Sequence, residues 1–467
     1  MSFRRIRTLS LVLLFLICGR WACAYAVLTH EELIDLTWQD SIVPLLLARY
    51  PHLTAAQLRE ARAYAYGGCV IQDIGYYPKG DRFFSNLTHY VRSGDFVVNL
   101  FRDAKTPDEL AFAVGALSHY IGDSIGHPDA TNIAVPLAFP TLKERYGPVV
   151  NYAEGEHQHV QVEFAFDIDQ LAHDRLAPLR FQRRQGFKVP VHQLALAFYQ
   201  TYGINDFVGI HEHFIKVRAY RYAVRRFIPH IALAVTLLHR HDEPPDPDTL
   251  DTRIIEREVA RVAAQEHWSV YRRKPGFETH VLAVLIFILP KVGPLALVNI
   301  KGPTEQTEAD YMHSLVLSLH ALRVSLHRFT PPRPGADPPN RKVAPAAPLP
   351  VDTRRERLQG KIDPRHPLPN RDLDTGHVVQ PGGYPLTDKT YAELLRHLAR
   401  HPHHPVPPGI VRNIEAYYSD PNAPIHTKLN PKRWAQVQKD LKTLAAMPTS
   451  AEPQPYPTFP DNAADDE

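Results

Sequence analysis

The segment HYIGDSIGH, residues 119–127, spaces His119, Asp123 and His127 four residues apart, twice in succession. An α-helix advances about 100° per residue, so residues at i, i+4 and i+8 share one face. We therefore expect a helix with two imidazoles and one carboxylate along a single stripe. The central carboxylate has two oxygens and can bridge two cations, so the stripe supplies part of a metal site. In a chain with 26 His, such spacing also arises by chance.

Signals for helix starts recur along much of the chain. A Thr precedes a Glu or Gln by three residues, the capping-box pattern, in the pairs Thr29 with Glu32, Thr54 with Gln57, and Thr106 with Glu109. Pro107 is typical of a first helical position, and Pro128 predicts that the same helix ends near His127. No run of alternating strands is convincing between residues 29 and 328, so we predict an all-α bundle whose helices pack through apolar stripes.

Two strongly apolar segments, residues 225–240 and 280–290, are also predicted helices. Both are shorter than the roughly 20 residues that a helix needs to cross a bilayer. Burial in the core is the simpler interpretation of these segments. A surface that touches lipid is the alternative.

The N-terminus has the pattern of a secretory signal peptide. Three Arg among the first seven residues precede the apolar stretch Leu9–Cys18, which is too short to span a membrane. Small-x-small cleavage sites would make Tyr25 or Val27 the first mature residue, and an uncleaved anchor is the alternative. We expect cleavage of residues 1–24 and a secreted or periplasmic protein.

The charge and cysteine content of the mature chain follow from that cleavage. Loss of residues 1–24 removes four Arg and no acidic residue, which changes the formal net charge from +3 to about −1. Proteins that bind phosphate backbones usually have a strongly basic balance, so nucleic acid is not favoured as a partner. Cys69 is then the only cysteine and forms no intramolecular disulfide. Stability must come from the core or from metals.

Proline content divides the rest of the chain. Residues 331–369 are Pro-rich and resemble an extended linker. The main domain before it spans residues 25–330. After it, residues 370–448 form a small module of unknown role, with amphipathic helices near 391–400 and 432–446 and a hairpin or loop at 376–386. Residues 449–467 have the composition of a disordered tail.

Metal-ligand residue types recur around the 119–127 stripe. His30 lies in the first mature helix, Asp73 ends the second, and His89 lies in the loop segment that follows. Later, His159 and Glu163 share one helix face, and Asp167 follows four residues on as a possible support. Zinc binds such nitrogen and oxygen ligands at about 2.0–2.2 Å. The candidates are too many for one tetrahedral ion: His30, Asp73, His89, His119, Asp123, His127, His159 and Glu163.

This ordered series resembles the zinc-dependent phospholipase C family over roughly residues 25–165. Relatives include the bacterial phosphatidylcholine-preferring enzymes and the catalytic domain of glycosylphosphatidylinositol-specific phospholipase D. The single-strand-specific zinc nucleases share the wider fold. The carrying features are the His-x3-Asp helix of His119 and the later His-x3-Glu helix of His159.

The resemblance implies two to three zinc ions. It assigns the first ion to Asp73, His89, His119 and Asp123, and the second to His127, His159 and Glu163. It assigns a third to His30, Asp123 and the backbone amine and carbonyl of Tyr25, where secreted relatives usually have Trp. The four-residue step from Asp123 to His127 matches the phospholipase D-like branch, so the substrate preference of the phosphatidylcholine enzymes is not carried over.

The predicted chemistry follows from charge. Clustered zinc ions neutralise an anionic phosphodiester and lower the pKa of bound water toward about 7, and the hydroxide attacks phosphorus. The resemblance gives Asp73 the added catalytic role of orienting that water. We predict a secreted phospholipase C-type hydrolase of phospholipids, with peripheral membrane contact and no obligate protein partner. The alternatives are a nuclease or other phosphodiesterase on the same zinc cluster, and a non-catalytic, metal-stabilised binding protein.

Overall fold

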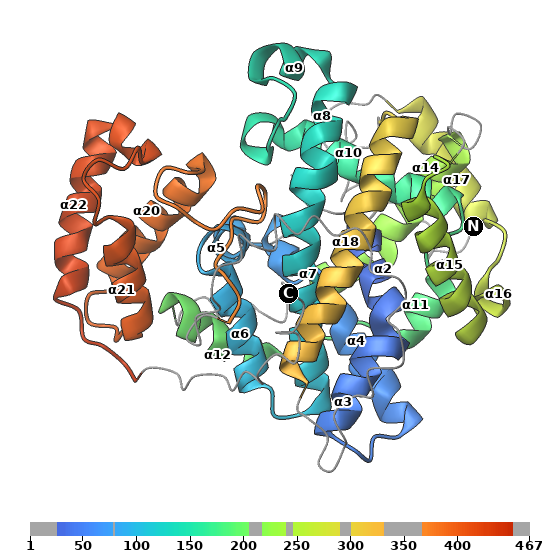
Figure 1. The fold of residues 1–467 in the computed structure, drawn as a ribbon, viewed down its shortest axis with the longest axis horizontal. Coiled ribbons are helices and arrows are strands. Elements are labelled where there is room, and N and C mark those ends of the chain that lie inside the picture. Colours follow the sequence, from blue (N-terminus) through green and yellow to red (C-terminus); the bar gives the residue numbers. More distant parts are fainter. Residues whose placement is uncertain are drawn as a thin grey trace, which may run out of the picture.

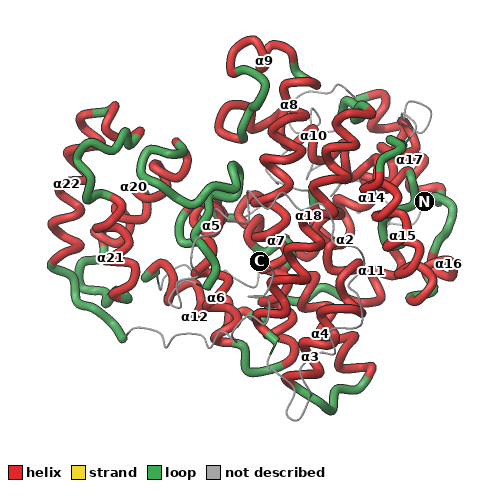
Figure 2. Tube along the Cα trace, viewed as in Figure 1, coloured by secondary structure: helices red, strands yellow, loops and turns green. Residues whose placement is uncertain are grey.

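The computed structural model describes residues 26–77, 80–204, 217–239, 246–289, 300–330 and 367–451. Within these ranges every named element is a helix (Figure 2), with two isolated β-bridges, Arg371 to Val378 and Val406 to Thr449. The predicted all-α fold is therefore confirmed. The predicted signal peptide with Tyr25, and nearly all of the predicted linker and tail, lie outside the described residues.

The centre of the bundle is α7, Pro107–Gly126 (Figure 1). It packs against α4 (Ala55–Gly68), α6 (Ser93–Asp103) and α18 (Glu305–Phe329). The crossing with α4 is close enough that two facing glycines are required. A Cβ on Gly115 would lie 2.2 Å from the carbonyl oxygen of Ala65, and one on Gly68 would lie 2.1 Å from that of Phe112.

The helix starts follow the capping signals with one exception. Thr54 and Thr106 form the predicted capping boxes of α4 and α7. The pair Thr29 and Glu32 does not, because α2 (Val27–Thr37) already begins two residues earlier. Thr29 hydrogen-bonds to Asp167 on a distant helix instead. Here a tertiary contact overrides the local signal.

The α-helix α7 ends at Gly126, next to the end predicted near His127. The chain then continues as a π-helical turn, η3 (His127–Thr131), into α8 (Asn132–Ala138). Pro128 is the second residue of that turn and has no backbone N–H to donate to the preceding turn. His127 is the first residue of this π-helical turn, and such turns are frequent at functional sites.

The remaining helices surround this centre. Their bounds are η1 Trp38–Ile42, α3 Val43–Arg49, η2 Gln72–Tyr76, α5 Arg82–Tyr90, α9 Pro140–Tyr146, α10 Tyr152–Ala172, α11 Leu179–Gln185, α12 Val191–Tyr202, η5 Ala223–Phe227, α14 Ile228–His239, α15 Leu250–Gln265, α16 Trp268–Tyr271 and α17 Phe277–Ile288.

The two apolar segments, residues 225–240 and 280–290, differ in how far their side chains are buried. In α14 the side chains of Ile231, Ala232 and Val235 are buried, which supports the core interpretation. In α17, which packs on α14, Ala283 and Ile286 are buried, but four large apolar side chains are exposed: Phe277, Val284, Phe287 and Ile288. Among the described helices, none is both long and apolar enough to span a bilayer.

The C-terminal part, drawn in orange and red in Figure 1, packs directly on the bundle. Its helices are α20 (Pro385–Arg400), α21 (Pro408–Tyr417), η7 (His426–Leu429) and α22 (Pro431–Ala445), and α20 lies against α5. The helices α20 and α22 correspond to the helices predicted near residues 391–400 and 432–446. The stretch 376–386 is mainly loop and turn before α20 begins.

Candidate metal centre

The structure brings all eight predicted side chains into one buried region, although six separate elements supply them. Three groups form, and within each group the ligand atoms all lie within 4.8 Å of one another. The groups are His30 with His119 and Asp123, Asp73 with His89 and His119, and His127 with His159 and Glu163. Because His119 belongs to two groups, the first two adjoin.

Two ligands lie on elements that differ from the prediction. Asp73 does not end α4 but lies in the short 3-10 helix η2. His89 is not in a loop but in the last turn of α5, which begins at an Asp81 side-chain cap. Ser85 joins the two elements, because its backbone carbonyl contacts His89 Nδ1 at 2.7 Å while its hydroxyl contacts the Gly75 amide at 2.9 Å.

The imidazoles of His89 and His119 are oriented as metal ligands. In each ring Nδ1 faces a backbone carbonyl, that of Ser85 for His89 and that of Cys69, at 3.1 Å, for His119. Donation from Nδ1 places the lone pair on Nε2. The two Nε2 atoms lie 3.4 Å apart, and two lone pairs at this distance repel unless a cation lies between them.

Asp123 occupies the position between two groups. Its Oδ2 lies 3.0 Å from His119 Nε2 and 3.4 Å from His89 Nε2, while its Oδ1 lies 3.2 Å from His30 Nε2. The His30 and His119 rings are stacked with centroids 4.2 Å apart. Each oxygen therefore faces a different imidazole set, the geometry of a carboxylate that bridges two cations.

The third group has the least satisfied polar atoms. Both oxygens of Glu163, both ring nitrogens of His127, and His159 Nδ1 are buried and have no hydrogen-bond partner among the described residues. His159 Nε2 contacts Asn132 Oδ1 at 2.8 Å, which directs Nδ1 into the group. Burial raises the pKa of Glu163 well above its usual value and, with His127 nearby, lowers that of His159.

These residues fit zinc. A buried polar atom without a partner costs free energy, and buried carboxylates cost more. A divalent cation in each group would satisfy them at once, and neutral imidazoles with carboxylates are ligands that zinc takes. A fourth acidic group, Asp169, His173 and Glu308, differs because it contains a cation already. There Arg175 lies 3.2 Å from Glu308, so we interpret that group as an ion-pair network.

Asp167 supports the centre indirectly. It accepts hydrogen bonds from the Leu28 amide at 2.9 Å, the Thr29 amide at 3.0 Å and the Thr29 hydroxyl at 2.7 Å. These contacts anchor the first turn of α2, which carries His30. Burial raises the pKa of Asp167 to about 7. His157, two residues before His159, is exposed and takes no part.

Sequence reasoning missed two residues that contact the centre. Asn132 orients His159, and Asp374 from the C-terminal part lies 3.8 Å from His127 Nε2. Asn132 follows the motif by five residues and carried no spacing signal. Asp374 lies beyond the predicted linker, and only the fold brings it here.

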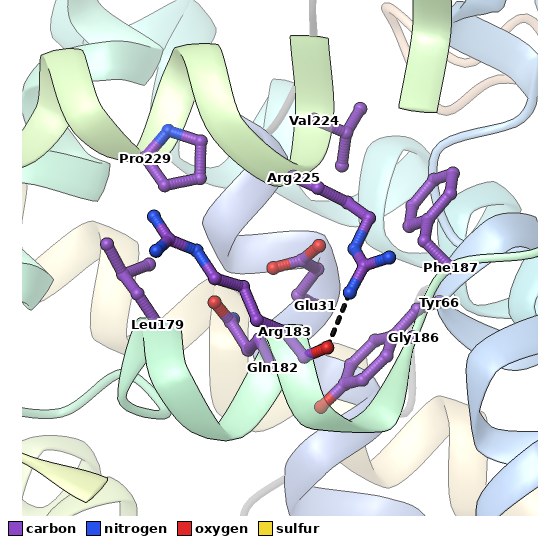
Figure 3. A pocket seen from close by; sticks show the side chains of 10 residues that line it. All are labelled: Glu31, Tyr66, Leu179, Gln182, Arg183, Gly186, Phe187, Val224, Arg225 and Pro229. Atoms are coloured by element: carbon purple, nitrogen blue, oxygen red, sulfur yellow. Dashed lines mark hydrogen bonds between the residues drawn. The ribbon is translucent and has the colours of Figure 1, made fainter. Parts of the chain in front are cut away.

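A separate pocket lies beside α2, the helix that carries His30. Glu31 points into it, between Arg183 and Arg225 (Figure 3). The Arg225 guanidinium donates to the backbone carbonyl of Arg183 at 2.5 Å. Burial raises the pKa of Glu31 well above its usual value. This pocket shares no lining residue with the three metal groups.

Comparison with known proteins addresses the family. The family model described as zinc dependent phospholipase C matches residues 29–211, a range that contains all eight side chains of the three groups and ends before α14. No curated protein and no solved structure matches the chain significantly. Residues 29–211 of this chain therefore match the zinc-dependent phospholipase C family.

Proposed function

We propose that this protein is an exported hydrolase that cleaves phospholipid phosphodiesters at a centre of two or three zinc ions. The observation that carries the proposal is the position of Asp123, whose two oxygens face His30 on one side and His119 with His89 on the other. The family domain supports the same reaction class. For the exported chain, N-terminal sequencing should find Tyr25 first, since its free amine would complete the third site.

The candidate residues have different roles in the proposed hydrolysis. When bound, zinc ions neutralise the phosphodiester oxygens and lower the pKa of water. The imidazoles of His89 and His119 direct Nε2 toward the centre, and Asp123 contacts two of the three groups. Asp73 is our candidate for the group that orients the attacking water. Its Oδ1 lies 3.3 Å from His89 Nε2, and neither of its oxygens has a hydrogen-bond partner among the described residues.

A side-by-side assay tests the substrate class. The purified protein is incubated with phosphatidylcholine vesicles and with single-stranded DNA, and the released products are identified. We expect a phosphorylated headgroup and diacylglycerol from lipid, lost by at least about 10²-fold in His119→Gln, since a metal ligand is removed. The exposed His157→Gln is the matched control and should keep wild-type activity. Release of nucleotides without lipid cleavage would identify a nuclease instead.

The exposed face of α17 is our candidate for membrane contact. Phe277, Val284, Phe287 and Ile288 lie along one side of that helix and face solvent. Apolar side chains on a short surface helix insert at the acyl boundary of a bilayer. We expect the double variant Phe287→Ser, Ile288→Ser to bind vesicles about tenfold or more weakly in a sedimentation assay, with unchanged cleavage of a water-soluble phosphodiester. Equal vesicle binding by variant and wild type would exclude this face.

A further inference from the structure

The C-terminal part places a carboxylate at the metal centre. Asp374 is buried, and its Oδ1 lies 3.8 Å from His127 Nε2. Its Oδ2 accepts hydrogen bonds from the Tyr90 hydroxyl at 2.9 Å and the Tyr384 hydroxyl at 2.5 Å. The two tyrosines therefore hold the carboxylate so that one oxygen is turned toward the His127 group.

The backbone around Asp374 is held by the elements that carry the ligands. The Leu373 amide donates to the carbonyl of His89 at 3.1 Å. Asn132, which orients His159, donates from Nδ2 to the carbonyl of Asp374 at 2.8 Å. Gly376, at φ +69°, allows the turn to lie on α7, because a Cβ there would lie 2.3 Å from the carbonyl oxygen of Ser124. This docking fixes the carboxylate at a defined place.

The charge on Asp374 needs a cation. Asp372 is a second buried carboxylate in the same turn, and Glu163 is a buried carboxylate in the group of His127. Two buried carboxylates that approach one imidazole are costly without a shared cation. Two bonds of about 2.0–2.2 Å from one zinc put its ligand atoms at most about 4.4 Å apart, so 3.8 Å is compatible with one ion.

We propose that Asp374 is a further ligand of the ion held by His127, His159 and Glu163. The inference rests on the proposed function for the presence of that ion, and it adds a ligand from outside the matched range 29–211. A catalytic zinc keeps three protein ligands and one open position, whereas four protein ligands close the site. Asp374 takes the open position.

A ligand at this position would restrict the access of substrate to the ion. A phosphate oxygen must displace the Asp374 carboxylate to reach this ion, so the C-terminal part competes with the substrate. The same part also covers the aromatic side chains beside the centre, because Leu386 packs on Tyr76 and Tyr152 and the Tyr384 hydroxyl accepts from the Ala153 amide. Binding of substrate and release of this segment are thereby coupled.

Cobalt substitution tests the ligand directly, because visible absorption of Co²⁺ reports the number of its ligands. The variant is Asp374→Asn. The matched control is Asp372→Asn, which removes the same charge from the same turn. The Asp372 carboxylate accepts hydrogen bonds from the amide and the hydroxyl of Thr375, within its own loop. Inorganic phosphate is titrated into each cobalt-loaded full-length protein, and the change in spectrum gives the phosphate affinity without any turnover.

We expect Asp374→Asn to change the cobalt spectrum and to bind phosphate about tenfold or more tightly than wild type, while Asp372→Asn matches wild type in both. A wild-type spectrum and phosphate affinity in Asp374→Asn would overturn the proposal, as would equal changes in both variants. Crystals of the zinc-loaded wild type need no variant: the proposal requires an ion within about 2.2 Å of Asp374 Oδ1. Failure to cleave phospholipid would contradict the proposed function and leave these readouts unaffected.

Discussion

Replacement of Asp123 by Asn is expected to lower phosphodiester hydrolysis by about 10³-fold or more and to reduce the zinc content by at least one ion per chain. Stabilisation of transition-state charge by a metal is worth several kcal/mol, and about 1.4 kcal/mol corresponds to a factor of ten in rate. Asp123 is fully buried, so no solvent can take over its role. Metal analysis and initial rates on the purified variant measure both effects.

The size of this effect follows from the two directions in which Asp123 acts. An amide has no charge and only one oxygen, so it can face either His30 or the pair His119 and His89, but not both. Asp108→Asn is the control, since Asp108 lies in the first turn of the same helix and far from the three groups. An Asp123→Asn protein with full zinc content and full activity would show that Asp123 does not bridge.

Removal of metal with a chelator is expected to cost the protein several kcal/mol of unfolding free energy. The reason is that Asp73, Asp123 and Glu163 are buried together, and a buried charge without its partner costs about 3–5 kcal/mol. For a chain of this size, a loss of that order lowers Tm by roughly 5 °C. Thermal unfolding followed by circular dichroism, with and without added zinc, measures the difference.

The control for metal removal is a protein in which the centre is already disrupted. In His119→Gln, which lacks the ligand shared by two groups, the chelator should lower Tm much less than in wild type, because less metal is held. Readdition of zinc to the wild type should restore Tm. Identical Tm values for the chelated and zinc-loaded wild type would mean that the buried carboxylates are stable without cations.

The sequence predicted those parts of the centre that share a helix. His119, Asp123 and His127 follow one helical period, and His159 and Glu163 follow another, so spacing alone places each set on one face. The capping boxes at Thr54 and Thr106 are equally local, and the structure contains both. Sequence spacing predicts a contact correctly where the two interacting residues lie within a few residues of each other.

The wrong predictions concern residues whose contacts lie far away in the sequence. Thr29 resembled a helix cap, but Asp167, more than a hundred residues away, takes its hydroxyl and shifts the helix start to Val27. His89 was expected in a loop, yet Asp81 caps the helix α5 that carries it. Asp374 had no periodic or motif signal, since only tertiary docking brings it beside His127.

Anomalous diffraction at the zinc absorption edge, from crystals of the purified full-length protein, tests the central claim most directly. The account predicts peaks within about 2.0–2.2 Å of the ligand atoms of His119 with Asp123 and of His127 with His159 and Glu163. The absence of any anomalous peak within bonding distance of these atoms, in a folded protein that still hydrolyses phosphodiesters, would contradict it.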